Sequence, residues 1–134
     1  MTTAPGKPQL NWRHVWLSCG YLFVLTVLAF ALWPLLNSRT MMIPYFDKFL
    51  HAFTFMFLML WFSGLMSRNF YFRLFLILLI YGALIEFLQN LTPHRQMELN
   101  DFIANAIGLI VGWLLARTGM GNWCIWVEKR LNLS

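Results

Sequence analysis

Charged side chains are scarce in this chain of 134 residues: ten are basic, five are acidic, and together they make up 11% of the sequence. Soluble domains carry about 25% charged residues and about 45–50% apolar ones, whereas 60% of this chain is hydrophobic. The scarcity of charge therefore excludes an ordinary soluble domain and predicts a membrane protein, short enough to form one domain. The net charge of +5 is spread too thinly for nucleic acid to be a partner.

Several other signatures of function are missing. The sequence has no serine triad pattern, no phosphate-binding loop and no HExxH motif, and nothing in it implies a cofactor. Cys19 and Cys124, the two cysteines, are both expected in the cytoplasmic half of the membrane or below it, which predicts no disulfide. No internal repeat and no broken helix is evident, so a transporter is not favoured.

Four apolar runs are present instead. They cover residues 15–36, 47–66, 70–91 and 98–116. The first, as a helix, would be about 33 Å long, enough for a hydrocarbon core of about 30 Å. The fourth is convincingly apolar only from Phe102 onward. We expect an all-α integral membrane bundle of four transmembrane helices over residues 15–117.

Short segments flank this domain. Residues 1–14 form a polar cytoplasmic arm, and residues 118–134 mix tryptophans with Glu128, Lys129 and Arg130, which predicts an amphipathic tail in the membrane interface. The lysines and arginines divide seven to three between the two sides. One side carries Lys7, Arg13, Arg68, Arg73, Arg117, Lys129 and Arg130, and the other carries Arg39, Lys48 and Arg95. This bias places both termini in the cytoplasm.

Glu86 is the most unusual residue, because it lies within an apolar run. An ionised carboxylate in hydrocarbon is costly, so an intramembrane Glu indicates a functional site and requires a partner. We expect that partner to be Arg95, which follows the break at Pro93.

Helical spacing places further polar residues near Glu86. Asp47 and His51 share one helical face, and Glu86 shares another with Gly82 and with either Gln89 or Asn90. In the fourth run, Asp101 and Asn105 continue into Gly108 and Gly112, a small-residue pair that lets a neighbouring helix approach closely. Three helices are thus expected to direct polar groups at one site near the outer surface. The expected ligand-binding residues are Asp47, Lys48, His51, Glu86, Gln89, Arg95, Asp101 and Asn105, and the expected packing residues are Gly82, Gly108 and Gly112.

This cluster is compatible with several roles. Glu86 or His51 could act as an acid or base. Arg95, Lys48 and the amides could bind an anionic headgroup or glycan. His51, Glu86 and Asp101 could supply metal ligands, but without a tight metal motif we assign none. The acidic residues in first helical turns, Asp47, Glu98 and Asp101, could also simply cap their helices, and a purely structural polar network remains open.

The order of these motifs resembles the VanZ-like family of small bacterial membrane proteins. The resemblance rests on Asp47-Lys48-x-x-His51, on Tyr81-x4-Glu86-x-x-Gln89, on Pro93-x-Arg95, and on Asp101-x3-Asn105-x-x-Gly108-x3-Gly112. His94 stands where the family usually has Gly. The resemblance implies a multi-pass protein of the bacterial inner membrane. The protein for which the family is named is associated with resistance to the glycopeptide teicoplanin. It supplies no catalytic assignment.

We therefore expect an envelope protein whose outward-facing pocket binds a lipid-linked or glycolipid headgroup or a lipophilic glycopeptide. One alternative is an acid/base enzyme acting on such a molecule. Another is a scaffold that forms homo-oligomers through the Gly108 and Gly112 stripe.

Overall fold

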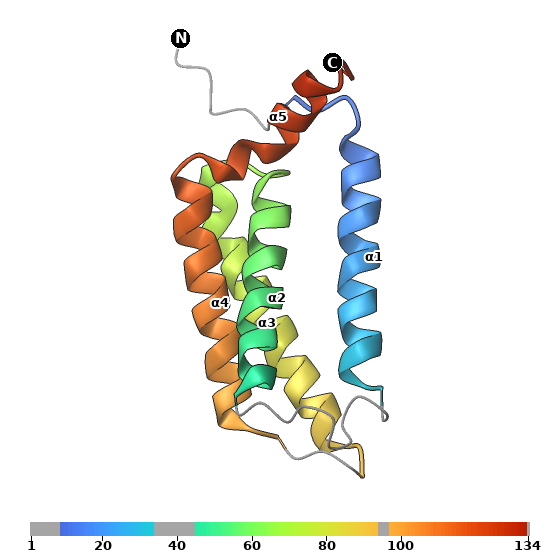
Figure 1. Ribbon diagram of the computed structural model, residues 1–134, viewed down its shortest axis with the longest axis vertical. Helices are drawn as coiled ribbons and strands as arrows, with labels where there is room; N and C mark the ends of the chain where they lie inside the picture. Colours follow the sequence, from blue (N-terminus) through green and yellow to red (C-terminus); the bar gives the residue numbers. More distant parts are fainter. Residues whose placement is uncertain (1–8, 34–44, 94–96, 134) are drawn as a thin grey trace.

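The computed structural model describes residues 9–33, 45–93 and 97–133, and every regular element in these ranges is a helix. The elements are α1 (Arg13–Ala31), α2 (Phe46–Ser63), η2 (Arg68–Phe70), α3 (Tyr71–Asn90), α4 (Leu99–Arg117), η3 (Met120–Asn122) and α5 (Trp123–Arg130). The long helices α1 to α4 run side by side, and the short helix α5 lies across one end of them (Figure 1). The prediction of an all-α fold is confirmed.

Three of the described helical segments are long and apolar enough to cross a membrane: Arg13–Ala31, Arg68–Asn90 and Leu99–Arg117. The prediction of four such segments is wrong by one, because α2 does not reach this standard. The reason is that Asp47, Lys48 and His51, in the first two turns, lower the mean hydropathy of this 18-residue helix.

Helix α2 packs directly against α4 through the small-residue stripe. A Cβ atom added at Gly108 would overlap the backbone carbonyl of Ala52, and one added at Gly112 would lie 2.7 Å from the carbonyl oxygen of Met56. Both glycines thus allow the two helix backbones to touch, which increases van der Waals contact. The stripe is occupied by α2 of the same chain, so a homo-oligomer would have to use another surface.

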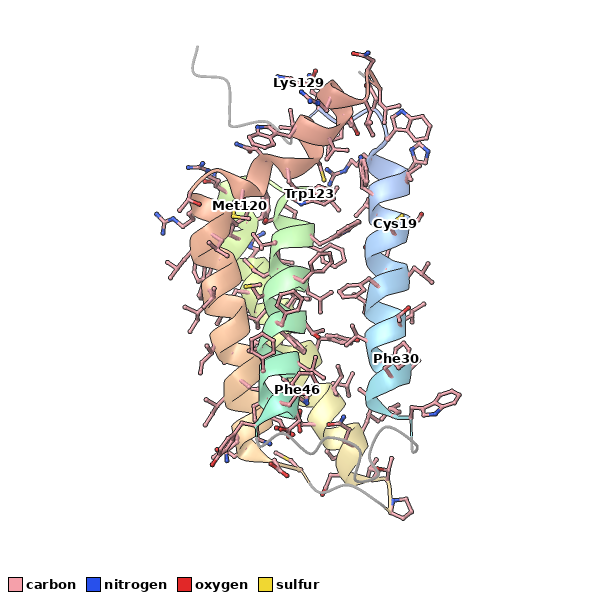
Figure 2. The ribbon with its side chains drawn as sticks, viewed as in Figure 1. Cys19, Phe30, Phe46, Met120, Trp123 and Lys129 are labelled. Atoms are coloured by element: carbon pink, nitrogen blue, oxygen red, sulfur yellow. The ribbon has the colours of Figure 1, made fainter. Side chains whose placement is uncertain are left out.

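Apolar side chains fill the interior of the bundle and also cover its outside. The buried core includes Phe55, Leu58, Met59, Phe62, Leu65, Tyr71, Leu74, Leu78, Ile85 and Leu109. On the outside, Phe30 of α1 is 60% exposed and points away from the other helices (Figure 2). A belt of exposed large apolar residues suits an environment of lipid tails rather than water.

Besides apolar packing, side chains of α2 and α3 hold helix α1 to the bundle by donating hydrogen bonds to its backbone carbonyls. The Tyr81 hydroxyl donates to Val24 at 2.6 Å, and the Gln89 amide donates to Ala31 at 2.9 Å. Closer to the other end, Trp61 donates to the carbonyl of Trp16 at 3.2 Å. Gly20 is the one residue of helix α1 that is buried, because aromatic side chains of α2 pack against it.

A buried carboxylate joins the start of α1 to α5. Glu128 is 3% exposed and accepts hydrogen bonds from the backbone N–H groups of Asn11 and Trp12 and from the Trp16 indole, at 2.9–3.0 Å. Burial alone raises the pKa of Glu128, but these three hydrogen bonds outweigh it and hold the pKa below its usual value. A negative charge here also suits the positive end of the α1 dipole.

Aromatic rings close the same end of the bundle. Trp123 packs against Trp16 and Trp61, with ring centroids 5.4 and 4.7 Å away, and its indole N–H donates to the Leu60 carbonyl near the end of α2 (Figure 2). On the outer side of α5, Trp126 is 77% exposed. The predicted amphipathic tail is therefore a helix with one face on the bundle and one face outward.

Candidate functional site

The polar residues of interest gather at the opposite end of the bundle from α5. There α2 and α4 begin and α3 ends, so the antiparallel arrangement brings the first turns of two helices beside the last turn of a third (Figure 1). Asp47, Lys48 and His51 come from α2, Glu86 from α3, and Asp101 and Asn105 from α4. His51 and Asn105, which are 54 positions apart in the chain, are thus brought into contact.

Lys48 is the centre of an ion-pair network at the rim of this site. Its Nζ atom lies 2.8 Å from Oδ2 of Asp47, 2.5 Å from Oε2 of Glu98 and 2.5 Å from Oδ1 of Asp101. One ammonium is therefore shared by three carboxylates from two helices. Capping was one of the roles open to Glu98, and its position three residues before Asp101 places both acids on the same helical face.

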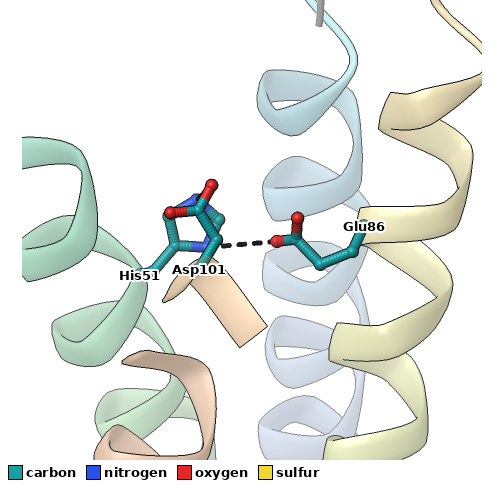
Figure 3. Close-up of side chains that lie close together, drawn as sticks. All are labelled: His51, Glu86 and Asp101. Atoms are coloured by element: carbon teal, nitrogen blue, oxygen red, sulfur yellow. Dashed lines mark ion pairs between the residues drawn. The ribbon is translucent and has the colours of Figure 1, made fainter. Parts of the chain in front are cut away.

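His51 forms the inner part of the site. Its Nδ1 atom lies 2.9 Å from Oδ1 of Asn105, and the same atom lies 3.8 Å from Oε1 of Glu86. The other ring nitrogen, Nε2, lies 3.9 Å from Oδ2 of Asp101. Figure 3 shows His51, Glu86 and Asp101 pointing toward one another. The three side chains are 14%, 1% and 10% exposed, respectively, so the group is nearly closed to solvent.

Asn105 completes the group from α4. The residue is fully buried, and within the described residues its Nδ2 atom has no hydrogen-bond acceptor. A Cβ atom added at Gly82 would lie 3.2 Å from this Nδ2. Gly82 therefore leaves the space in which the Asn105 amide sits beside α3.

The remaining predicted residues have other surroundings. Gln89 is buried, but its amide donates to the end of α1. Asp47 contacts Lys48 rather than His51, so the carboxylates close to His51 are those of Glu86 and Asp101. The predicted partner of Glu86, Arg95, lies outside the described residues.

Glu98, the N-cap residue of α4, makes no side-chain capping hydrogen bond to its helix. At this end of the bundle the His51 imidazole lies between the carboxylates of Glu86 and Asp101. At the rim, three carboxylates face the single ammonium of Lys48. His51, Glu86 and Asp101 can each direct one ligand atom toward a common point, since these atoms lie within 4.8 Å of one another.

Glu128, at the opposite end, is a buried acid that the sequence analysis assigned only to the polar part of the tail. Its three donors come from residues more than a hundred positions earlier. No local pattern in the sequence identifies such a pairing.

Comparison with protein families adds a chain-wide match. The model of the VanZ/LLP1 family matches residues 7–122, which includes α1 to α4 and the whole candidate site. No curated protein and no solved structure matches the chain.

Proposed function

The chain belongs to the VanZ/LLP1 family, and on that premise we propose that it is a cell-envelope protein that binds the polar headgroup of a lipid-linked glycan, a glycolipid or a lipophilic glycopeptide. The observation that carries this proposal is the gathering of His51, Glu86, Asp101 and Asn105 at one end of an otherwise apolar bundle. Buried polar groups in a membrane-like interior are costly, and such groups commonly mark a site of function.

The network around Lys48 favours a particular headgroup chemistry. Its ammonium is shared by three carboxylates, so it is not a free contact for a phosphate. Carboxylate and amide oxygens accept hydrogen bonds from hydroxyl and amino groups. A sugar or amino-sugar headgroup fits this set of acceptors, and Arg95 remains the expected contact for any anionic group.

The proposal includes an orientation in the membrane. Helix α2 runs beside the apolar helices α3 and α4, and the site would open at the external face of the bacterial inner membrane. This is supported by Arg13, Arg68, Arg117, Lys129 and Arg130, which belong to the α5 end of the bundle, because positive charge favours the cytoplasmic side.

The direct test is native mass spectrometry of the protein purified in a mild detergent. We expect the wild type to retain a lipid or glycolipid, and Glu86→Gln to lose it. The matched control is Glu128→Gln, which removes a buried carboxylate at the other end and should keep the bound mass. A bare wild type, or equal retention in both variants, would overturn the binding proposal.

A second function is favoured by the position of His51 between two carboxylates. An imidazole so placed can take up or release a proton, so an enzyme acting on the same class of envelope lipid or glycan is the alternative. It predicts that a retained ligand is converted on incubation and that the pH profile of turnover shifts in Glu86→Gln. A ligand that stays bound and unchanged would reject this alternative.

The cellular form of the proposal concerns glycopeptides. If the site captures a lipophilic glycopeptide, expression of the wild-type chain should raise the inhibitory concentration of teicoplanin more than expression of Glu86→Gln at equal protein level. Vancomycin, which lacks the acyl chain, is the control drug. Equal susceptibility to teicoplanin of strains with and without the protein would show that the protein plays no role in resistance.

A further inference from the structure

We propose that His51, Glu86 and Asp101 bind a divalent transition-metal cation, with Zn²⁺ and Mn²⁺ as the cations to test first. This goes beyond headgroup binding, and its test requires no headgroup.

The donor set and its spacing are the first support. One nitrogen and two carboxylate ligands come from three different helices, and the ligand atoms lie within 4.8 Å of one another. Metal bonds of about 2.0–2.2 Å place two ligands at most about 4.4 Å apart. Nε2 of His51 lies 3.9 Å from Oδ2 of Asp101, already within that limit. The Glu86 carboxylate lies 3.8 Å from the other ring nitrogen, Nδ1, so its side chain would have to turn toward Nε2 to join the cation.

Asn105 supports the proposal from the second layer. A metal-binding histidine commonly donates its other ring N–H to an oxygen, which fixes the tautomer and the ring orientation. If Nδ1 of His51 donates to Oδ1 of Asn105, at 2.9 Å, then Nε2 carries the lone pair that can bind a cation on the Asp101 side.

The other end of the same amide points to a further ligand. Nδ2 of Asn105 is completely buried and lacks an acceptor among the described residues. A buried N–H without an acceptor is costly. A water or hydroxide bound to the cation would supply that acceptor, and three protein ligands leave a coordination position for it.

Charge at the rim also favours a cation. Asp47, Glu98 and Asp101 share the single ammonium of Lys48. Asp101 keeps a second oxygen, Oδ2, directed toward His51. A divalent cation there would offset negative charge that is expensive to bury. The competing explanation is that a protonated His51 supplies the positive charge and no metal binds.

Elemental analysis of the purified full-length protein distinguishes the two explanations. We expect about one Zn or Mn per chain in wild-type protein prepared without chelator. Chelator-treated protein should then be titrated with each cation by calorimetry and thermal unfolding. We expect His51→Gln and Asp101→Asn to weaken binding by at least about tenfold, in line with the loss of a ligand or its support.

The matched control is Glu128→Gln, which removes a buried carboxylate at the opposite end of the bundle and leaves the proposed ligand set intact. It should keep wild-type affinity for the cation. Metal-free wild-type protein that neither cation stabilises would overturn the proposal, as would equal affinity in wild type and Asp101→Asn. The elemental content of the wild type decides the matter even if a variant fails to fold. Because metal content and retained lipid are read separately, the cation proposal and the headgroup proposal can fail independently.

Discussion

Nδ1 of His51 on α2 lies 2.9 Å from Oδ1 of Asn105 on α4. One residue further along α2, the backbone of Ala52 contacts Gly108 of α4, about one turn beyond Asn105. The hydrogen bond and the closest approach of the two helices are therefore parts of one contact. Loss of either should disturb the other, and the candidate site is supported by the most tightly packed region of the bundle.

Asn105→Ala should lower stability by about 1–3 kcal/mol, because it removes the acceptor of a buried hydrogen bond and leaves His51 unsatisfied. Thermal unfolding in detergent measures the change. Asn100→Ala, at an exposed position of the same helix, is the control and should have little effect. An Asn105→Ala protein as stable as the control would show that the contact with His51 contributes nothing to folding.

Gly108→Ala should destabilise the protein by at least about 2 kcal/mol, since overpacking of a filled interior typically costs about 1–3 kcal/mol and here the obstacle is backbone. Chemical or thermal unfolding in detergent checks this. The control is Ala83→Leu, a larger change at an exposed position of α3, and we expect it to be tolerated. Equal stability of the two variants would contradict the close contact between α2 and α4.

Tyr81→Phe should loosen α1 while leaving the rest of the bundle intact, because the variant loses the hydrogen bond to the Val24 carbonyl. Hydrogen bonds between helices in membranes are worth about 0.6 kcal/mol on average and at most about 1.7 kcal/mol. Hydrogen exchange of α1 amides should therefore quicken by about threefold, and at most by about eighteenfold. Tyr21→Phe, which alters an exposed tyrosine of α1, should leave exchange unchanged, and a similar response in both variants would refute the assigned role of Tyr81.

Glu128→Gln should lower the stability of the protein at pH 7 and not at low pH. The folded-state pKa of Glu128 lies below its usual value, so its stabilisation is fully present above the unfolded pKa of about 4.3 and is lost as the pH falls through the folded pKa. We expect a loss on the order of 1 kcal/mol at pH 7, from weaker hydrogen bonds to a neutral acceptor. Melting temperatures of both proteins between pH 7 and pH 3 would measure it. A difference that is independent of pH would argue against an ionised Glu128.

The sequence predicts the helical bundle and much of the candidate site because both depend on local periodicity. Glu86 is unusual within an apolar run, and the stripe from Asp101 to Gly112 follows directly from helical spacing. These patterns predict which faces meet. They do not predict which side chains pair within the site. From the sequence, Lys48 is expected to bind a ligand, but in the structure its ammonium pairs with three carboxylates.

Hydrogen bonds from a side chain to the backbone of a distant helix are harder to predict from the sequence. Gln89 has the spacing of a site residue, but the free carbonyl at the end of α1 lies close enough to accept its hydrogen bond. The shortfall in spanning segments has a related cause. Lys48 and His51 of α2 pair with polar side chains of α3 and α4, so α2 tolerates polar turns that an isolated membrane helix would not.

The link from Glu128 to the start of α1 has a consequence for biosynthesis. Asn11 and Trp12 leave the ribosome more than a hundred residues ahead of their acceptor, Glu128. Helix α1 can enter the bilayer early, but its final docking must wait for α5. A nascent chain stopped before residue 128 should therefore hold the start of α1 loosely, and protection of that part of the helix against a membrane-permeant probe should increase once Glu128 has been made.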